Sequence, residues 1–180
     1  MTVVIINGCP WLTSGKDTFC EFCKDYRGNY VTSISTVDYI KEIAHEIGWD
    51  GEKTPKARKF LSDLKDLTTE FIDFPFVSTV KRVNNFFRDI EISCGNLNKA
   101  VIFIHSREPE EIERFKKELN AITLLIRRPE VENQEQSNHA DANYLNYKYD
   151  YTIINDGTFD DLKEKARRFL IEISGKIWFL

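Results

Sequence analysis

The sequence lacks the features of a secreted or membrane protein. Only four of its 180 residues are cysteine, too few to suggest the disulfide framework of a small secreted domain. No apolar run is long enough to span a membrane, and Asn7 and Gly8 interrupt the early apolar run before it reaches the length of a signal peptide. We therefore expect a cytoplasmic protein with no membrane partner.

The sequence also lacks an excess of basic residues. Its 25 Lys and Arg residues face 29 Asp and Glu residues, and the net charge of −4 argues against a general surface for polymeric nucleic acid. We find no repeat, linker or low-complexity segment. Hydrophobic residues at 42% and aromatic residues at 13% predict a packed globule, and the length suits a single domain over residues 1–180.

A Cys-x-x-Cys pair, Cys20 and Cys23, has two interpretations. The spacing occurs in redox and zinc sites, but a zinc site needs a second pair, which the sequence does not contain. The two residues lie one turn apart in a predicted helix, and Cys23 shares its apolar face. We interpret them as ordinary helix residues. His139 and Asp141 likewise lack the paired spacing of a zinc site.

The most specific pattern lies near the N-terminus. Residues 3–6 (Val-Val-Ile-Ile) predict a buried strand, and the amphipathic residues 19–26 predict a helix. Between them, Gly8 and Gly15 bound a loop, and Lys16 follows. Backbone N–H groups and a helix N-terminus attract phosphates in such an arrangement, and the lysine reaches the outer ones. The predicted phosphate-binding residues are Gly8, Thr13, Ser14, Gly15, Lys16, Asp17 and Thr18.

This loop departs from the usual phosphate loop in two ways. Six residues (9–14) separate its glycines, whereas the usual motif has four. Asp17 replaces the Ser or Thr that normally binds magnesium, and Thr18 follows it. Because a carboxylate can hold magnesium directly or through water, Asp17 and Thr18 are the predicted metal contacts. The alternative is an ordinary strand-to-helix turn that carries a chance Gly-Lys pair.

Apolar runs and amphipathic stretches alternate along the rest of the chain. The spacing predicts four more strands, at 30–35, 100–105, 122–126 and 151–154. It predicts helices at 40–48, 54–71, 76–90, 108–119 and 158–173, the second of which has Ala57, Leu61, Leu64 and Phe71 on its apolar face. The alternation indicates a three-layer α/β fold with a five-stranded parallel sheet flanked by helices. The second and third strands are separated by a helical insertion (about 36–92), and the fourth is followed by a long polar loop (about 127–149).

Ligands of parallel sheets bind at the carboxyl ends of the strands. That rule places the glycine loop, residues 35–38, residues 105–108, Arg127 and Arg128 at one edge. A guanidinium binds phosphate oxygens in pairs, which suits Arg127 and Arg128 to a polyphosphate site. The alternative for both arginines is a solvated position at the strand end or a surface position where they pair with acidic side chains.

Four stretches, taken in order, resemble the nucleoside monophosphate kinase branch of the phosphate-loop fold. They are residues 14–19 (Ser-Gly-Lys-Asp-Thr-Phe), 38–42 (Asp-Tyr-Ile-Lys-Glu), 104–109 (Ile-His-Ser-Arg-Glu-Pro) and the arginine pair. More narrowly, the sequence is similar to phage and bacterial deoxynucleoside monophosphate kinases and to the related animal-type phosphomevalonate kinases. It departs from them in the enlarged loop and in His105, where a magnesium-binding carboxylate is expected.

The resemblance implies ATP-dependent, magnesium-dependent phosphoryl transfer to a nucleoside or deoxynucleoside monophosphate. The resemblance also implies that Lys16, Arg127 and Arg128 are catalytic, that the helical insertion holds the acceptor, and that the polar loop is a lid. The implied acceptor-binding residues are Asp38, Lys41, Arg58 and Arg107. Structural or surface roles are the alternative for these acceptor residues. Three other functions remain open: a kinase for another phosphorylated acceptor such as phosphomevalonate, a shikimate-like or free nucleoside kinase, and a nucleotide-binding protein without transferase activity. The apolar residues 177–180 pack either on the core or against a second copy in a homodimer.

Overall fold

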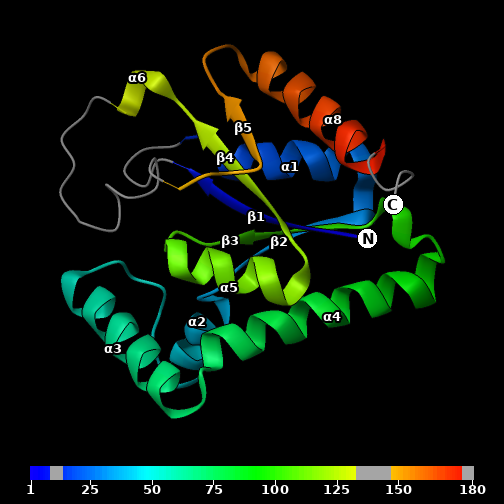
Figure 1. The fold of residues 1–180 in the computed structure, drawn as a ribbon. Helices are drawn as coiled ribbons and strands as arrows, with labels where there is room; N and C mark the ends of the chain where they lie inside the picture. Colours follow the sequence, from blue (N-terminus) through cyan, green and yellow to red (C-terminus); the bar gives the residue numbers. More distant parts are fainter. Residues whose placement is uncertain (9–13, 133–146, 176–180) are drawn as a thin grey trace.

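Five parallel strands form one sheet at the centre of the protein (Figure 1). The computed structural model describes residues 1–8, 14–132 and 147–175. The strands lie in the order β2-β3-β1-β4-β5. Their bounds are Thr2–Gly8 for β1, Val31–Ser35 for β2, Val101–His105 for β3, Ile122–Arg127 for β4 and Tyr151–Ile154 for β5. The predicted five-stranded parallel sheet is confirmed.

The first strand lies in the middle of this sheet. In the register, Ile6 is opposite His105 on β3, and Gly8 is opposite Ile126 on β4. Residues 3–8 of β1 are all buried, which is why they read as an almost continuous apolar run. The loop that follows β1 therefore leaves from the centre of the carboxyl edge, between the ends of β3 and β4.

Helices cover both faces of the sheet (Figure 1). On one face, Phe19 of α1 and Phe169 of α8 share an apolar cluster with β1, β3 and β4. On the other, Phe87 of α4 and Phe115 of α5 belong to a second cluster. The longer helices are α1 (Lys16–Arg27), α2 (Asp38–Glu46), α3 (Pro55–Ile72), α4 (Phe74–Cys94), α5 (Pro109–Leu119) and α8 (Phe159–Gly175). Short elements are η1 (Gly28–Tyr30), η2 (Leu97–Lys99) and α6 (Pro129–Glu132).

Cys20 and Cys23 lie in α1 with free thiols and belong to the first cluster. Burial raises the pKa of the Cys23 thiol to about 12, so it stays protonated. This environment agrees with their interpretation as core residues of a helix. No helix in the described ranges is both long enough and apolar enough to cross a membrane.

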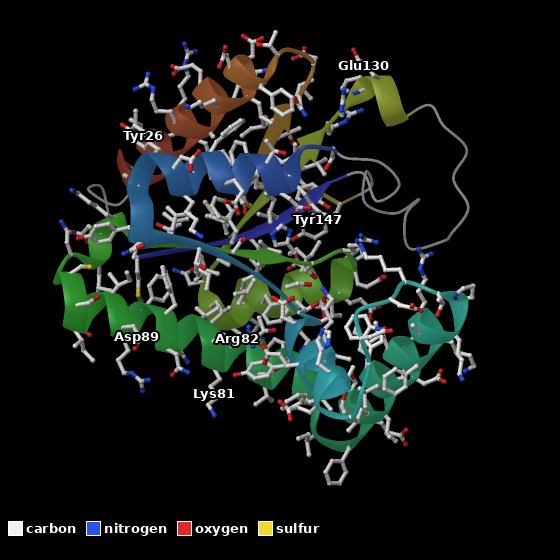
Figure 2. The ribbon with its side chains drawn as sticks, turned by 180° about the vertical axis from the view of Figure 1, so that it is seen from behind. Tyr26, Lys81, Arg82, Asp89, Glu130 and Tyr147 are labelled. Atoms are coloured by element: carbon white, nitrogen blue, oxygen red, sulfur yellow. The ribbon has the colours of Figure 1, made fainter. Side chains whose placement is uncertain are left out.

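The insertion between β2 and β3 consists of α2, α3 and α4. Arg82 on α4 stacks on the ring of Tyr39 at 3.9 Å and pairs with Glu42, so it ties α2 to α4 (Arg82 is labelled in Figure 2). The α3 helix has no buried residue, and Phe71, expected on its apolar face, is 81% exposed. That expectation was wrong because α3 packs against α2 and α4 rather than on the sheet (Figure 1).

The end of the predicted lid packs against the body of the protein. Tyr147 (labelled in Figure 2) and Tyr149 lie against the second apolar cluster, and Tyr147 donates a hydrogen bond to Glu113 on α5. The hydroxyl of Tyr149 accepts a hydrogen bond from the side-chain amide of Asn7 at 2.9 Å. The middle of the predicted lid, residues 133–146, lies outside the described residues.

Candidate functional site

The N-terminus of α1 is held in one conformation by a glycine and an asparagine. Gly15 precedes the helix with φ of 89°, a left-handed conformation that favours glycine. A Cβ atom at this position would lie 2.4 Å from Nδ2 of Asn155, so a larger residue would have to displace that side chain. The same Nδ2 donates a hydrogen bond to the carbonyl oxygen of Ser14 at 2.9 Å. The backbone just before Lys16 is therefore fixed, and the first amides of α1 are available for an anion.

Ser14 also contributes a buried hydroxyl to this region. Its Oγ atom has no hydrogen-bond partner in the described part of the chain. Gly8, at the end of β1, packs closely on it, since a Cβ atom there would lie 2.4 Å from this Oγ. Thr13, the remaining predicted phosphate contact, lies outside the described residues.

A cavity of about 760 Å³ opens on one side of the α1 N-terminus. Lys16 and Asp17 line it, together with the ends of β2 and β3. Three of the four predicted acceptor residues also line it: Asp38, Lys41 and Arg107. The fourth, Arg58, is exposed on α3 and is not among the lining residues.

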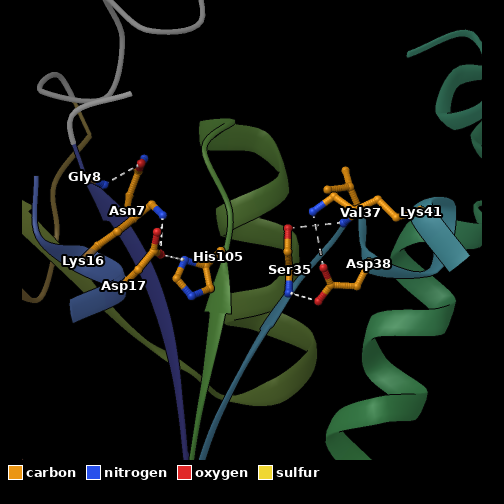
Figure 3. Close-up of polar contacts among 9 residues, drawn as sticks. All are labelled: Asn7, Gly8, Lys16, Asp17, Ser35, Val37, Asp38, Lys41 and His105. Atoms are coloured by element: carbon orange, nitrogen blue, oxygen red, sulfur yellow. Dashed lines mark hydrogen bonds and ion pairs between the residues drawn. The ribbon is translucent and has the colours of Figure 1, made fainter. Parts of the chain in front are cut away.

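Lys16, Asp17 and His105 form a polar group between the ends of β1 and β3 (Figure 3). Nζ of Lys16 lies 2.6 Å from Oδ1 of Asp17, and Nδ1 of His105 lies 3.5 Å from the same oxygen. Burial alone would raise the pKa of Asp17, but the hydrogen bond and charge of Lys16 lower it overall. Burial and the nearby Lys16 ammonium lower the pKa of His105 to about 4. At neutral pH the site thus contains an ionised carboxylate and a neutral imidazole.

Asp38 belongs to a second polar group at the end of β2 (Figure 3). Its Oδ2 accepts a hydrogen bond from the backbone N–H of Ser35 at 2.6 Å. Its Oδ1 lies 3.7 Å from Nζ of Lys41. One oxygen of Asp38 therefore holds the turn into α2, while the other, with Lys41, faces the cavity.

Two basic residues that the sequence analysis did not single out also line this cavity of about 760 Å³. Lys53 comes from the turn before α3, and Lys65 comes from α3 itself. Neither they nor Arg107 form an ion pair with any described residue, although Glu108 and Glu111 line the same cavity. Lys65 follows Arg58 by seven residues, which is about two helical turns and hence the same helix face. That spacing was the signal that could have found Lys65; Lys53 has no comparable signal.

A second cavity, of about 230 Å³, lies on the other side of the α1 N-terminus. Its lining includes Gly15, Thr18, Arg128 and Asn155. The backbone N–H of Asn155 donates a hydrogen bond to the carbonyl oxygen of Arg127 at 2.6 Å. Arg127 and Arg128 thus stand where β4 ends, as predicted, and Arg128 faces this smaller cavity. Asn155 was missed, although it directly follows β5 and the carboxyl-edge rule applies to it as well.

Comparisons with known proteins support the fold. No protein-family model and no curated protein matches the sequence. A dephospho-CoA kinase from Campylobacter jejuni has a similar structure, with a TM-score of 0.51 and 16% identity over 97% of this chain and 98% of that chain. An APS kinase from Mycobacterium tuberculosis aligns over 95% of this chain and 96% of its own, with 11% identity and a TM-score of 0.40. The first likeness shows a three-layer α/β fold over nearly the whole chain.

Proposed function

We propose that this protein is an ATP-dependent kinase that phosphorylates a small molecule already carrying a phosphate. A nucleoside or deoxynucleoside monophosphate is the acceptor that the sequence resemblance favours. One observation carries the proposal: the N-terminus of α1, with Lys16 at its start, lies between two cavities. A phosphate chain bound at this helix end would connect a donor site with an acceptor site.

The donor nucleotide fits the smaller cavity and the helix end. The amides of α1 and the helix dipole attract its phosphates, and Lys16 reaches the outer ones. Thr18, Arg128 and Asn155 would then contact the donor nucleotide, since they line the smaller cavity beside Gly15. The terminal phosphate would face the larger cavity, where Lys16 and Asp17 lie.

The acceptor fits the larger cavity because three basic groups there form no ion pair with a described residue. They are Lys53, Lys65 and Arg107. A phosphate dianion placed among them would give these groups an anionic partner. Lys41 adds a fourth positive charge, partly balanced by Asp38. Arg58, on the same face of α3 as Lys65, remains a proposed contact at the rim.

The residues at the helix end suit a divalent cation. Asp17 offers a carboxylate oxygen and Thr18 a hydroxyl, both of which are oxygen ligands that Mg²⁺ accepts. A bound Mg²⁺ neutralises the charge on the β- and γ-phosphates of the donor. Lys16 and one or both of Arg127 and Arg128 supply the remaining positive charge around the transferred group.

One observation favours the alternative of a different phosphorylated acceptor, such as phosphomevalonate. The described lining of the larger cavity contains no Phe, Tyr or Trp side chain. Among the described lining residues, a nucleobase would find only the imidazole of His105 to stack on, whereas a compact, highly charged acceptor needs no ring. Both acceptors place a phosphate near the same lysines.

The test is ADP release from ATP and magnesium in the presence of each common nucleoside or deoxynucleoside monophosphate, followed by phosphomevalonate. We expect one or a few acceptors to stimulate release by orders of magnitude over ATP alone. Lys16→Ala should abolish the stimulation, and Lys59→Ala, on the outer face of α3, should not. ATP binding without transfer to any acceptor would instead establish a non-catalytic nucleotide-binding protein. Failure to bind ATP would overturn the proposal.

A further inference from the structure

His105 occupies a position from which it shares one oxygen of Asp17 with Lys16. It is the last residue of β3, next to the strand that leads into the phosphate loop. Its side chain is only 17% exposed, whereas that of Asp17 is 78% exposed. The 3.5 Å between Nδ1 of His105 and Oδ1 of Asp17 is longer than the usual range of about 2.7–3.2 Å for a hydrogen bond. The imidazole and the carboxylate are therefore close together without a hydrogen bond of ordinary length between them.

The same separation suits two ligands of one metal ion. With metal–nitrogen and metal–oxygen bonds of about 2.1 Å, neighbouring ligand atoms lie about 3–3.5 Å apart. A neutral imidazole has one ring nitrogen with a lone pair, which makes histidine a common metal ligand. A neutral imidazole and a carboxylate that point at each other can converge on a cation.

Lys16 competes for the oxygen of Asp17 and would release it to the metal when phosphates bind. Its Nζ atom lies 2.6 Å from Oδ1 of Asp17. Phosphate oxygens bind lysine strongly, so a nucleotide at the α1 N-terminus would draw this ammonium toward itself. The carboxylate of Asp17 would then bind the metal ion in place of the Lys16 ammonium.

We infer that Asp17 and His105 together ligate the divalent cation that accompanies the nucleotide, and that the site favours Mn²⁺ over Mg²⁺. This inference rests on the proposed function, because the nucleotide phosphates supply the other ligands. No group of three or more His, Cys, Asp or Glu side chains in the described ranges forms a metal site without them. Mg²⁺ prefers an all-oxygen shell, whereas imidazole suits transition metals and Mn²⁺ accepts carboxylate and phosphate oxygens as well.

The test is pulsed electron–nuclear double resonance on Mn²⁺ bound with ADP to the full-length protein labelled with ¹⁵N-histidine. The label separates histidine nitrogen from the nitrogens of the base. We expect a ¹⁵N coupling in the unmodified protein that His105→Asn removes. His45→Asn is the matched control, because His45 lies on α2, contacts the carbonyl oxygen of Trp49 and does not line the cavity. It should leave the coupling intact.

Titration calorimetry gives a second readout on the same complexes. His105→Asp replaces the nitrogen ligand with an oxygen ligand, which Mg²⁺ prefers. The ratio of Mn²⁺ to Mg²⁺ affinity for the ADP complex should therefore fall by about tenfold or more. Absence of any ¹⁵N coupling in the unmodified protein, or a coupling that survives His105→Asn, would overturn the inference alone, provided that ADP binds. If ADP does not bind at all, the proposed function fails and this inference fails with it.

Discussion

The side chain of Asn155 is hydrogen-bonded to the backbone of Ser14, although 141 residues separate them in the sequence. The backbone N–H of Asn155 is also bonded, at 2.6 Å, to the carbonyl oxygen of Arg127. A single residue after β5 therefore joins the end of β4 to the backbone that leads into α1. The position of this backbone depends on a residue from the far end of the chain as well as on Gly15.

Replacing Asn155 should weaken nucleotide binding without unfolding the protein. Asn155→Ala removes the 2.9 Å hydrogen bond to Ser14, a contribution of about 0.5–1.5 kcal/mol. ADP affinity, measured by calorimetry, should fall by about 2- to 10-fold. Asn98→Ala, at an exposed position of η2, should bind ADP like the unmodified protein. Equal affinities for all three proteins would mean that the Asn155 contact does not position the loop.

Lys53 and Lys65 should affect the acceptor rather than the donor. Either Lys→Ala substitution removes a charge-assisted contact of about 1.5–3 kcal/mol, so the KM for the acceptor should rise by about 10- to 100-fold. The KM for ATP should stay within about twofold. Lys59→Ala is the control, because Lys59 is exposed on the same helix and pairs with Asp63. A rise in the KM for ATP, or an equal effect of Lys59→Ala, would contradict the assignment.

The sheet was predictable from the sequence because its central strands are buried on both faces. Residues 3–6 and 101–104 read as apolar runs for that reason. The rule that ligands bind at the carboxyl edge then brought Lys16, Asp38 and Arg107 to one cavity, since the rule depends only on strand direction. This part of the site follows from topology.

The contribution of the insertion was not predictable in the same way. An amphipathic pattern shows which face of a helix is apolar but not what covers it, so the pattern alone did not show that Phe71 would be exposed. Lys53 and Lys65 reach the cavity through the packing of α3 against α2 and α4, and no local pattern encodes that packing. The separation of Arg128 from the larger cavity likewise depends on how the loops after β4 and β5 fold.

Asp150 should stabilise the fold through contacts at the start of β5. Its Oδ2 accepts hydrogen bonds from the backbone N–H and the hydroxyl of buried Thr123, both at 2.9 Å, and its Oδ1 lies 3.0 Å from Nζ of Lys116. Asp150→Ala leaves the Thr123 N–H without this partner and should lower the free energy of unfolding by about 1–3 kcal/mol. Urea denaturation measures the change. Asp63→Ala, which breaks an exposed pair, should cost about 1 kcal/mol or less; a similar loss in both variants would refute the role of Asp150.

His105 should make stability depend on pH below neutrality. Its folded pKa of about 4 lies below the ordinary value near 6.5. Between these values the unfolded chain binds a proton that the folded protein does not, so the free energy of unfolding rises with pH across this window. The contribution is fully present above about pH 6.5 and is lost as the pH falls to about 4. At about 1.4 kcal/mol per pKa unit, this shift amounts to about 3.5 kcal/mol.

Carboxylates titrate in the same window, so the difference between two proteins isolates this contribution. His105→Asn has no proton to bind at this position, and its free energy of unfolding should fall less steeply than that of the unmodified protein between pH 6.5 and 4. His45→Asn removes a histidine that lies outside the cavity and should retain the steeper fall. If the curves of His105→Asn and the unmodified protein ran parallel, His105 would have its ordinary pKa in the folded state.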